Sequence, residues 1–128
     1  LINHFKSNQV KTAMVSGGLN FFAKKLQAEL EIEKYRANNV EIINGLMTGN
    51  VLGKVVDAKE KAAYIKELCE EFNLKNDQVV AIGDGANDIE MMKVAGMSVA
   101  YHAKPLLKEY CNIQINFGGL DSLIHFFE

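Results

Sequence analysis

An acidic, glycine-rich stretch in the second half of the chain carries the strongest chemical signal. Residues 83–88 read Gly-Asp-Gly-Ala-Asn-Asp and directly follow an apolar run that ends at Ile82. Two carboxylates and an amide therefore lie where a buried strand is expected to stop, which is unfavourable unless they are solvated, paired or bound to a cation. Because these side chains offer oxygen donors, the cation that suits them is Mg²⁺. The alternative is a solvated turn in which Asp88 caps the next helix.

A second candidate site follows an earlier apolar run, residues 12–15. Ser16, Gly17 and Gly18 come next, and a helical pattern begins at Leu19. Glycines let backbone N–H groups approach an anion, and the N-terminus of a following helix favours negative charge. The Ser16 hydroxyl adds a further donor. This segment is therefore a candidate phosphate cradle, and an ordinary helix cap with a glycine turn is the alternative.

Lysine at the start of a helix is the third candidate feature. Lys61 lies in the first turns of a predicted helix that precedes the acidic stretch. A cation at that end opposes the helix macrodipole, which favours a specific anionic partner. Lys59 is placed as well as Lys61, spacing does not choose between them, and a solvated surface lysine is the alternative for both. The three histidines show no ligand spacing and are expected to be structural or surface residues: His4, His102 and His125.

Hydrophobic periodicity predicts the elements that must position these residues. Apolar residues at steps of three and four predict helices over about 19–30, 57–72 and 89–95, the last closed by Gly96, with further helices opening at Pro105 and over 120–127. Short apolar runs predict strands over 12–15, 78–82, 97–101 and 113–115. Asn44-Gly45, flanked by apolar residues, predicts a β-hairpin near 40–51. Strands that are apolar throughout and alternate with helices predict an α/β fold with a mainly parallel sheet and helices on its faces.

Composition limits the class of protein. The chain has 128 residues, 48% of them hydrophobic, a formal net charge of −2 and only two cysteines, Cys69 and Cys111. This is typical of one globular domain and excludes disordered, collagen-like and coiled-coil chains. No apolar run approaches the ~20 residues of a membrane span, and the near-neutral charge argues against a general nucleic-acid binder. Two cysteines and no signal-peptide pattern favour reduced thiols and a cytoplasmic location.

Four stretches in order along the chain resemble the haloacid dehalogenase superfamily, and within it the phosphoserine phosphatases. They are Val-Ser-Gly-Gly at 15–18, Val-Asp-Ala-Lys-Glu-Lys at 56–61, Ala-Ile-Gly-Asp-Gly-Ala-Asn-Asp at 81–88 and Ala-Tyr-His-Ala-Lys-Pro at 100–105. The acidic motif alone is typical of the superfamily, since cation-pumping ATPases have a similar one. The combination covers nearly the whole chain and is more specific. The implied fold is a Rossmann-like, three-layer α/β/α core.

The resemblance implies a Mg²⁺-dependent hydrolase of small phosphomonoesters, here O-phosphoserine in serine biosynthesis. In that family a nucleophilic Asp forms an aspartyl-phosphate, which water then hydrolyses. The resemblance assigns phosphate binding to Ser16 and the Gly17 backbone, and charge stabilisation to Lys61 rather than Lys59. It makes Asp84 the Mg²⁺ ligand, Asn87 a substrate contact and Asp88 a carboxylate associated with the metal site. No nucleic acid or membrane partner is implied.

The family's first motif, Asp-x-Asp-x-Thr, has no counterpart in this sequence. Residues 1–15 contain neither Asp nor Glu, so the nucleophile, the acid/base residue, the first and central strand, and the substrate-selecting cap are all outside the chain. Residues 1–128 are therefore expected to be the C-terminal part of a core domain and inactive alone. Removing a central strand would leave two half-sheets with unpaired inner edges, which favour self-association.

Two other readings compete with this one. A re-paired or strand-swapped chain could be a non-catalytic module that keeps the fold and binds phosphate or Mg²⁺. A related phosphatase could act on another small phosphorylated metabolite, because the cap that would select the substrate is outside this sequence.

Overall fold

Residues 1–127 are described by the computed structural model, and they divide into two compact units. One unit comprises residues 2–60, and the other comprises Leu1 together with the chain from Lys61 onward. Each unit contains a three-stranded sheet, with the strand orders β1-β2-β3 and β4-β5-β6. The expected division into two half-sheets is thus confirmed. Within residues 1–127, β1 pairs only with β2 and β4 only with β5, so each of these two strands has an open edge.

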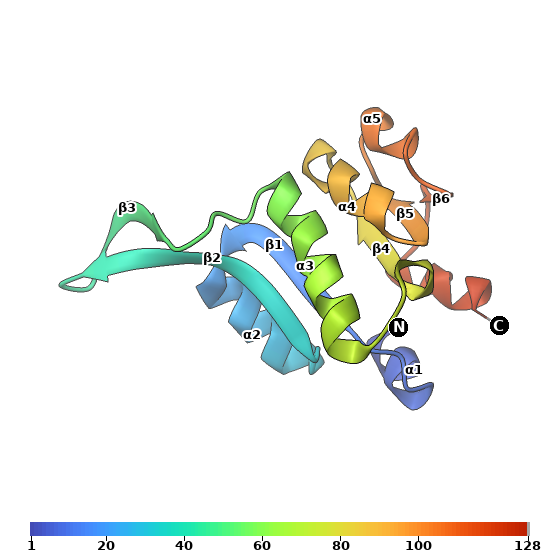
Figure 1. The fold of residues 1–128 in the computed structure, drawn as a ribbon, viewed down its shortest axis with the longest axis horizontal. Helices are drawn as coiled ribbons and strands as arrows, with labels where there is room; N and C mark the ends of the chain where they lie inside the picture. The colour runs from blue at the N-terminus through green and yellow to red at the C-terminus, as the bar shows by residue number, and fades with distance from the viewer. Residues whose placement is uncertain (128) are drawn as a thin grey trace. The chain divides into compact units, whose positions relative to one another are not determined.

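The first unit is a sheet with one helix against it (Figure 1). Its elements are α1 (Ile2–Ser7), β1 (Ala13–Leu19), α2 (Asn20–Leu30), β2 (Lys34–Ile43) and β3 (Leu46–Leu52). Strand β2 is parallel to β1 and antiparallel to β3. The predicted helix over 19–30 is confirmed. Helix α1 and the first half of β2 were not predicted, since neither α1's six residues nor the polar residues of β2 give a clear hydrophobic period.

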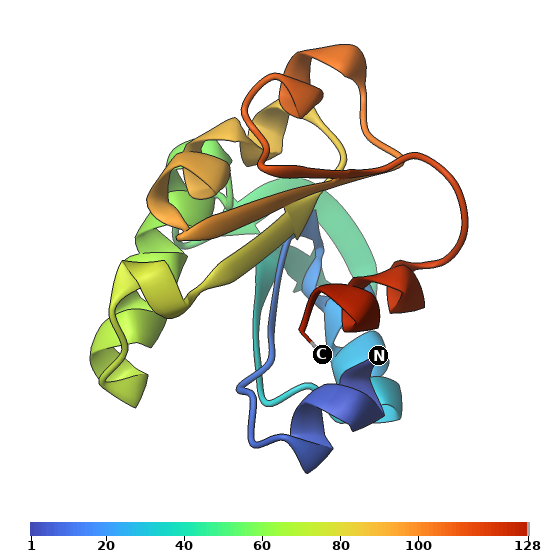
Figure 2. The same cartoon turned by 90° about the vertical axis from the view of Figure 1, so that its right-hand side faces the viewer.

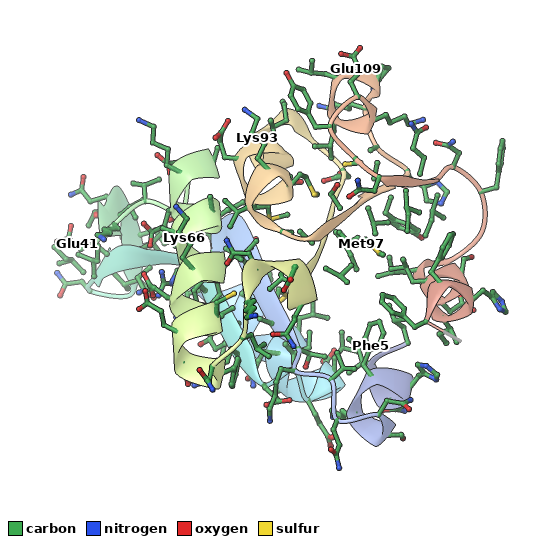
Figure 3. All side chains as sticks on the ribbon, turned by 45° about the vertical axis from the view of Figure 1, so that its right-hand side comes forward. Phe5, Glu41, Lys66, Lys93, Met97 and Glu109 are labelled. Atoms are coloured by element: carbon green, nitrogen blue, oxygen red, sulfur yellow. The ribbon has the colours of Figure 1, made fainter. Side chains whose placement is uncertain are left out.

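The predicted hairpin is confirmed and projects away from α2 (Figure 1). Asn44 and Gly45 both have positive φ, 51° and 77°, as a two-residue turn of the primed type requires. Glu41 lies on this hairpin (Figure 3) and accepts hydrogen bonds from Thr48 Oγ1 at 2.7 Å and Asn50 Nδ2 at 3.1 Å. These two bonds lower the pKa of the Glu41 carboxyl. They tie the two strands together on an exposed surface, where apolar packing is weak.

Helix α2 is amphipathic, but its apolar stripe is largely exposed. Ala23 is buried, whereas the larger members of the stripe, Phe22, Leu26 and Leu30, are exposed, Phe22 to 65% of its area. The period of the apolar residues therefore predicted the helix correctly but did not predict which of them the sheet would cover.

The second unit alternates strands and helices along the chain. Helix α3 (Ala58–Phe72) leads into it and is followed by η1 (Asn76–Gln78), β4 (Val80–Gly83), η2 (Ala86–Asp88), α4 (Ile89–Val94), β5 (Met97–Tyr101), α5 (Pro105–Lys108), β6 (Ile113–Ile115) and η3 (Leu120–Phe126). Strands β4, β5 and β6 run parallel, side by side (Figure 2). Val99, Ile115 and Leu123 form a buried cluster on one face of this sheet. Ala100, next to Val99 along β5, is also fully buried and points to the opposite face.

Three local expectations in this unit need correction. The last helical segment, 120–126, is a 3₁₀ helix, and Gln78 belongs to η1 rather than to the strand. Gly96 does not have the positive φ of a left-handed cap. A Cβ at Gly96 would lie 2.4 Å from Asp77 Cα, so glycine is needed there because two backbone segments meet. Among the described residues, no helix is long and apolar enough to cross a membrane.

Candidate active site

Asp88 organises the loop that follows β4. Asp88 is 4% exposed, and its side chain accepts three hydrogen bonds. Oδ1 accepts from Lys61 Nζ at 2.7 Å, and Oδ2 accepts from the backbone N–H groups of Asp84 at 3.1 Å and Gly85 at 3.3 Å. Asp88 makes no side-chain cap to α4. The alternative in which it caps the next helix is therefore wrong, because the carboxylate turns back toward the strand end instead.

Of the two lysines that the sequence offers as candidates, Lys59 and Lys61, only Lys61 is buried. It is 6% exposed and pairs with Asp88, whereas Lys59 is exposed. The structure therefore distinguishes two residues that spacing could not. Asp57 fixes where α3 starts, because its Oδ1 accepts a hydrogen bond from the backbone N–H of Glu60 at 2.8 Å. Lys61 follows in the next position of that helix.

Asp84 and Asn87 present exposed side chains from the same loop. Within residues 1–127, the Asp84 carboxylate has no hydrogen-bond or ion-pair partner. Its backbone is held instead, since Asp84 O accepts a hydrogen bond from Lys104 N at 2.9 Å. The turn that carries Lys104 includes His102, which has a φ of 44° and whose Nε2 lies 2.8 Å from Gly118 O. The His102 ring is thus held against the Gly118 backbone.

Gly83 is required by the position of the Asp88 side chain. A Cβ at Gly83 would lie 2.5 Å from Asp88 Oδ2 and 2.7 Å from its Cγ. The carboxylate can fold against the end of β4 only because position 83 has no side chain. A Cβ at Gly85 would meet only the end of the Asn87 side chain, at 2.9 Å. A side chain at position 83 would thus displace the buried Asp88 carboxylate, whereas one at position 85 would displace only the exposed end of Asn87.

The Ser16-Gly17-Gly18 segment lies in the other unit and is part of β1. The expected end of the strand at residue 15 is wrong, because the strand continues to Leu19. The pairing with β2 is irregular over this stretch: Val15 pairs with Arg36, but the next pair is Leu19 with Asn38, so β1 holds extra residues. Ser16 Oγ accepts from Gly18 N at 3.0 Å, which leaves the hydroxyl hydrogen available to a ligand. The segment still leads directly into α2 at Asn20.

Asn38 is the residue that the sequence analysis did not identify. It is 7% exposed, and its carboxamide donates to Gly17 O at 2.8 Å and accepts from Val56 N at 2.7 Å. The sequence carries no signal for it, because the first half of β2 is not predicted as a strand and nothing local reveals that two distant backbone segments meet there.

The residues present fit part of a Mg²⁺ site. Mg²⁺ in proteins is commonly held by one or two carboxylates together with waters and phosphate oxygens. Asp84 offers one exposed carboxylate, whereas both oxygens of Asp88 already bond to protein donors. Within residues 1–127 no group of three or more His, Cys, Asp or Glu side chains could hold a metal ion. The described residues therefore supply an incomplete ligand set of the right chemistry.

Comparison with known proteins agrees with this chemistry. A family model described as haloacid dehalogenase-like hydrolase matches residues 1–127. A phosphoserine phosphatase from Polaromonas sp. is 41% identical over 97% of this chain, and one from Haemophilus influenzae is 45% identical over 89% of it. These matches cover 54% and 36% of the two relatives, so the chain spans about half of their length or less.

Solved structures show the same likeness. A probable phosphoserine phosphatase from Vibrio cholerae superposes with a TM-score of 0.91 at 36% identity, over 96% of this chain and 38% of its own. A phosphoserine phosphatase captured as a phospho-aspartyl intermediate analogue superposes with a TM-score of 0.93 at 33% identity, over 98% of this chain and 60% of its own.

The buried pair predicts a difference between two neighbouring lysines. K61M leaves the Asp88 carboxylate buried without its cation, which should lower the free energy of unfolding by about 3–5 kcal/mol. K59M, which alters an exposed lysine in the same helix turn, should change it by less than ~0.5 kcal/mol. Urea unfolding followed by circular dichroism measures both. Equal effects of the two substitutions would contradict the assigned role of the pair.

The two glycines of the loop predict a second contrast. G83A should push the Asp88 side chain away from β4 and weaken its bonds to Lys61 and the loop amides, destabilising the protein by ~1–3 kcal/mol. G85A needs only a movement of the exposed Asn87 side chain and should cost much less. Urea unfolding measures the stability of each variant, and amide exchange at residues 84 and 85 should rise in G83A alone. Unchanged exchange in G83A would show that Asp88 does not hold this loop.

Proposed function

Because the chain belongs to the haloacid dehalogenase-like hydrolase family, we propose that the protein containing it is a Mg²⁺-dependent phosphatase of O-phosphoserine. The observation that carries this proposal is the buried Lys61–Asp88 pair behind an exposed Asp84, at the end of β4. The phosphoserine phosphatases that share 41% and 45% identity with the chain support the choice of substrate. We further propose that the protein is located in the cytoplasm and that phosphoserine is the small molecule that it binds there.

The proposed reaction runs in two steps through an Asp that lies outside residues 1–128. Its carboxylate attacks the phosphorus, the bond between phosphorus and the serine oxygen breaks, and that oxygen leaves with a proton from an acid. Water then attacks the phosphorus of the aspartyl-phosphate and releases inorganic phosphate and the free carboxylate. The Asp would come from a strand that the open edges of β1 and β4 could accept. Residues 1–128 alone would then be inactive.

The chain's own residues would bind the phosphate and stabilise its charge. The Ser16 hydroxyl and the Gly17 N–H would donate to phosphate oxygens, and Asn87 would contact the rest of the substrate. Lys61 Nζ donates one hydrogen to Asp88 and has two more for the phosphate and the nucleophile. Asp84 would hold Mg²⁺, which when bound supplies charge neutralisation at the phosphoryl oxygens. Asp88 would keep Lys61 and the loop in place.

Phosphate release by the full-length protein tests the proposal. With Mg²⁺ it should hydrolyse phosphoserine in preference to a panel of other phosphate esters, and chelation should abolish turnover. D84N should lose ~10²-fold or more of the activity, since the carboxylate that would hold Mg²⁺, and with it the charge neutralisation at the phosphate, is removed. D77N, which alters an exposed Asp elsewhere in the same unit, should keep wild-type activity.

Three outcomes would each change the assignment in a different way. Preference for another ester would keep the phosphatase and replace its substrate. Absence of turnover with every ester would favour a non-catalytic module that only binds phosphate or Mg²⁺. Turnover by residues 1–128 alone would show that the nucleophile lies within this chain.

A further inference from the structure

Asn38 joins two backbone segments that the sequence separates widely. Its carboxamide N–H donates to Gly17 O at 2.8 Å, and its carbonyl oxygen accepts from Val56 N at 2.7 Å. Asn38 is 7% exposed, so water has little access to compete for either of these hydrogen bonds. The two segments also lie close together, since a Cβ added to Gly17 would lie only 3.4 Å from Val56 O. Asn38 is thus a clamp between residue 17 and residue 56.

The clamp acts where the sheet's own hydrogen bonding is irregular. The β1–β2 register shifts between Val15 and Leu19, so residues 16–18 lack the regular ladder that holds the rest of β1. The bond from Asn38 to Gly17 O provides a side-chain substitute for that ladder. A segment whose amides are free of the ladder can turn them toward an anion, provided that something else fixes its shape.

The other end of the clamp fixes the approach to α3. Val56 comes two residues before Ala58, where the helix starts. Arg36, two positions from Asn38 on the same face of β2, makes a 2.8 Å ion pair with Glu60 in the first turn of α3. Asn38 and Arg36, both on β2, therefore hold the start of α3. Lys61 is the residue of α3 that directly follows Glu60.

We infer that Asn38 is a positioning residue of the phosphate site: it holds Gly17 against Val56 and so sets the shape of the segment that binds phosphate. This inference rests on the proposed function. Only a carboxamide of this length supplies a donor and an acceptor at the two required places. Aspartate keeps the acceptor for Val56 but sets a negative oxygen against Gly17 O, and serine is too short to bridge the gap.

The test compares N38D and N38S with wild type in the full-length protein. Both variants should raise the KM for phosphoserine and the inhibition constant of inorganic phosphate about ten-fold or more, with a smaller fall in kcat, because the phosphate-binding segment is misplaced. N39D introduces the same charge at the exposed neighbouring residue and should leave both constants unchanged. G96A, destabilised by a clash with the Asp77 backbone in the other unit, should also leave them unchanged and controls for lost stability.

The outcomes separate this inference from the proposed function. Folded N38D and N38S with wild-type KM and inhibition constant would overturn it. If neither variant folds, Asn38 is merely structural and the inference is overturned as well. If the wild type hydrolyses no phosphoserine, the proposed function fails, and the dissociation constant of inorganic phosphate, measured by calorimetry, decides for Asn38. A ten-fold weaker binding in N38D than in N39D would still support the clamp, and equal binding would refute it.

Discussion

The ion pair between Lys61 and Asp88 is the interaction on which the second unit, from Lys61 onward, depends. Both side chains are almost completely buried, and their charged atoms lie 2.7 Å apart. Neither charge would be tolerated there without the other, because desolvation costs each ion several kcal/mol. The pair therefore couples the start of α3 to the loop after β4, which are 27 residues apart in the sequence. A chain that forms one of these elements without the other leaves a charge buried and unpaired.

The backbone around the pair has adapted to it. Asp88 reaches Lys61 with one oxygen and the amides of Asp84 and Gly85 with the other, so the same carboxylate fixes the helix and the loop. That arrangement leaves no space for a side chain at Gly83. Asp84, by contrast, keeps its carboxylate in solvent because its backbone alone is fixed. Within this motif, Asp88 therefore holds the structure together, whereas the Asp84 carboxylate remains accessible to a ligand.

The sequence was sufficient to predict most elements and the chemistry of the acidic loop. Apolar periodicity gave α2 and α3, Asn44-Gly45 gave the hairpin, and the run before Gly83 gave β4. What it could not predict depends on contacts between distant segments. Lys59 and Lys61 are alike in sequence, and only burial against Asp88 separates them. The apolar run predicts a strand that ends at residue 15, whereas β1 continues through Ser16 and the two glycines with an irregular register.

Asn38 and Asp88 show why the residue type alone does not reveal whether a polar side chain holds the backbone or remains available to a ligand. Each is buried, and between them they bond to three backbone amides, one backbone carbonyl and one lysine. Ser16, Asp84 and Asn87 are of similar chemistry but are at least partly open to solvent. A buried polar group must satisfy its hydrogen bonds within the protein, so it is committed to holding backbone, whereas an accessible one can still exchange water for a ligand. Burial, which the sequence does not give residue by residue, thus separates Asn38 and Asp88, which hold backbone, from Ser16, Asp84 and Asn87, which remain accessible.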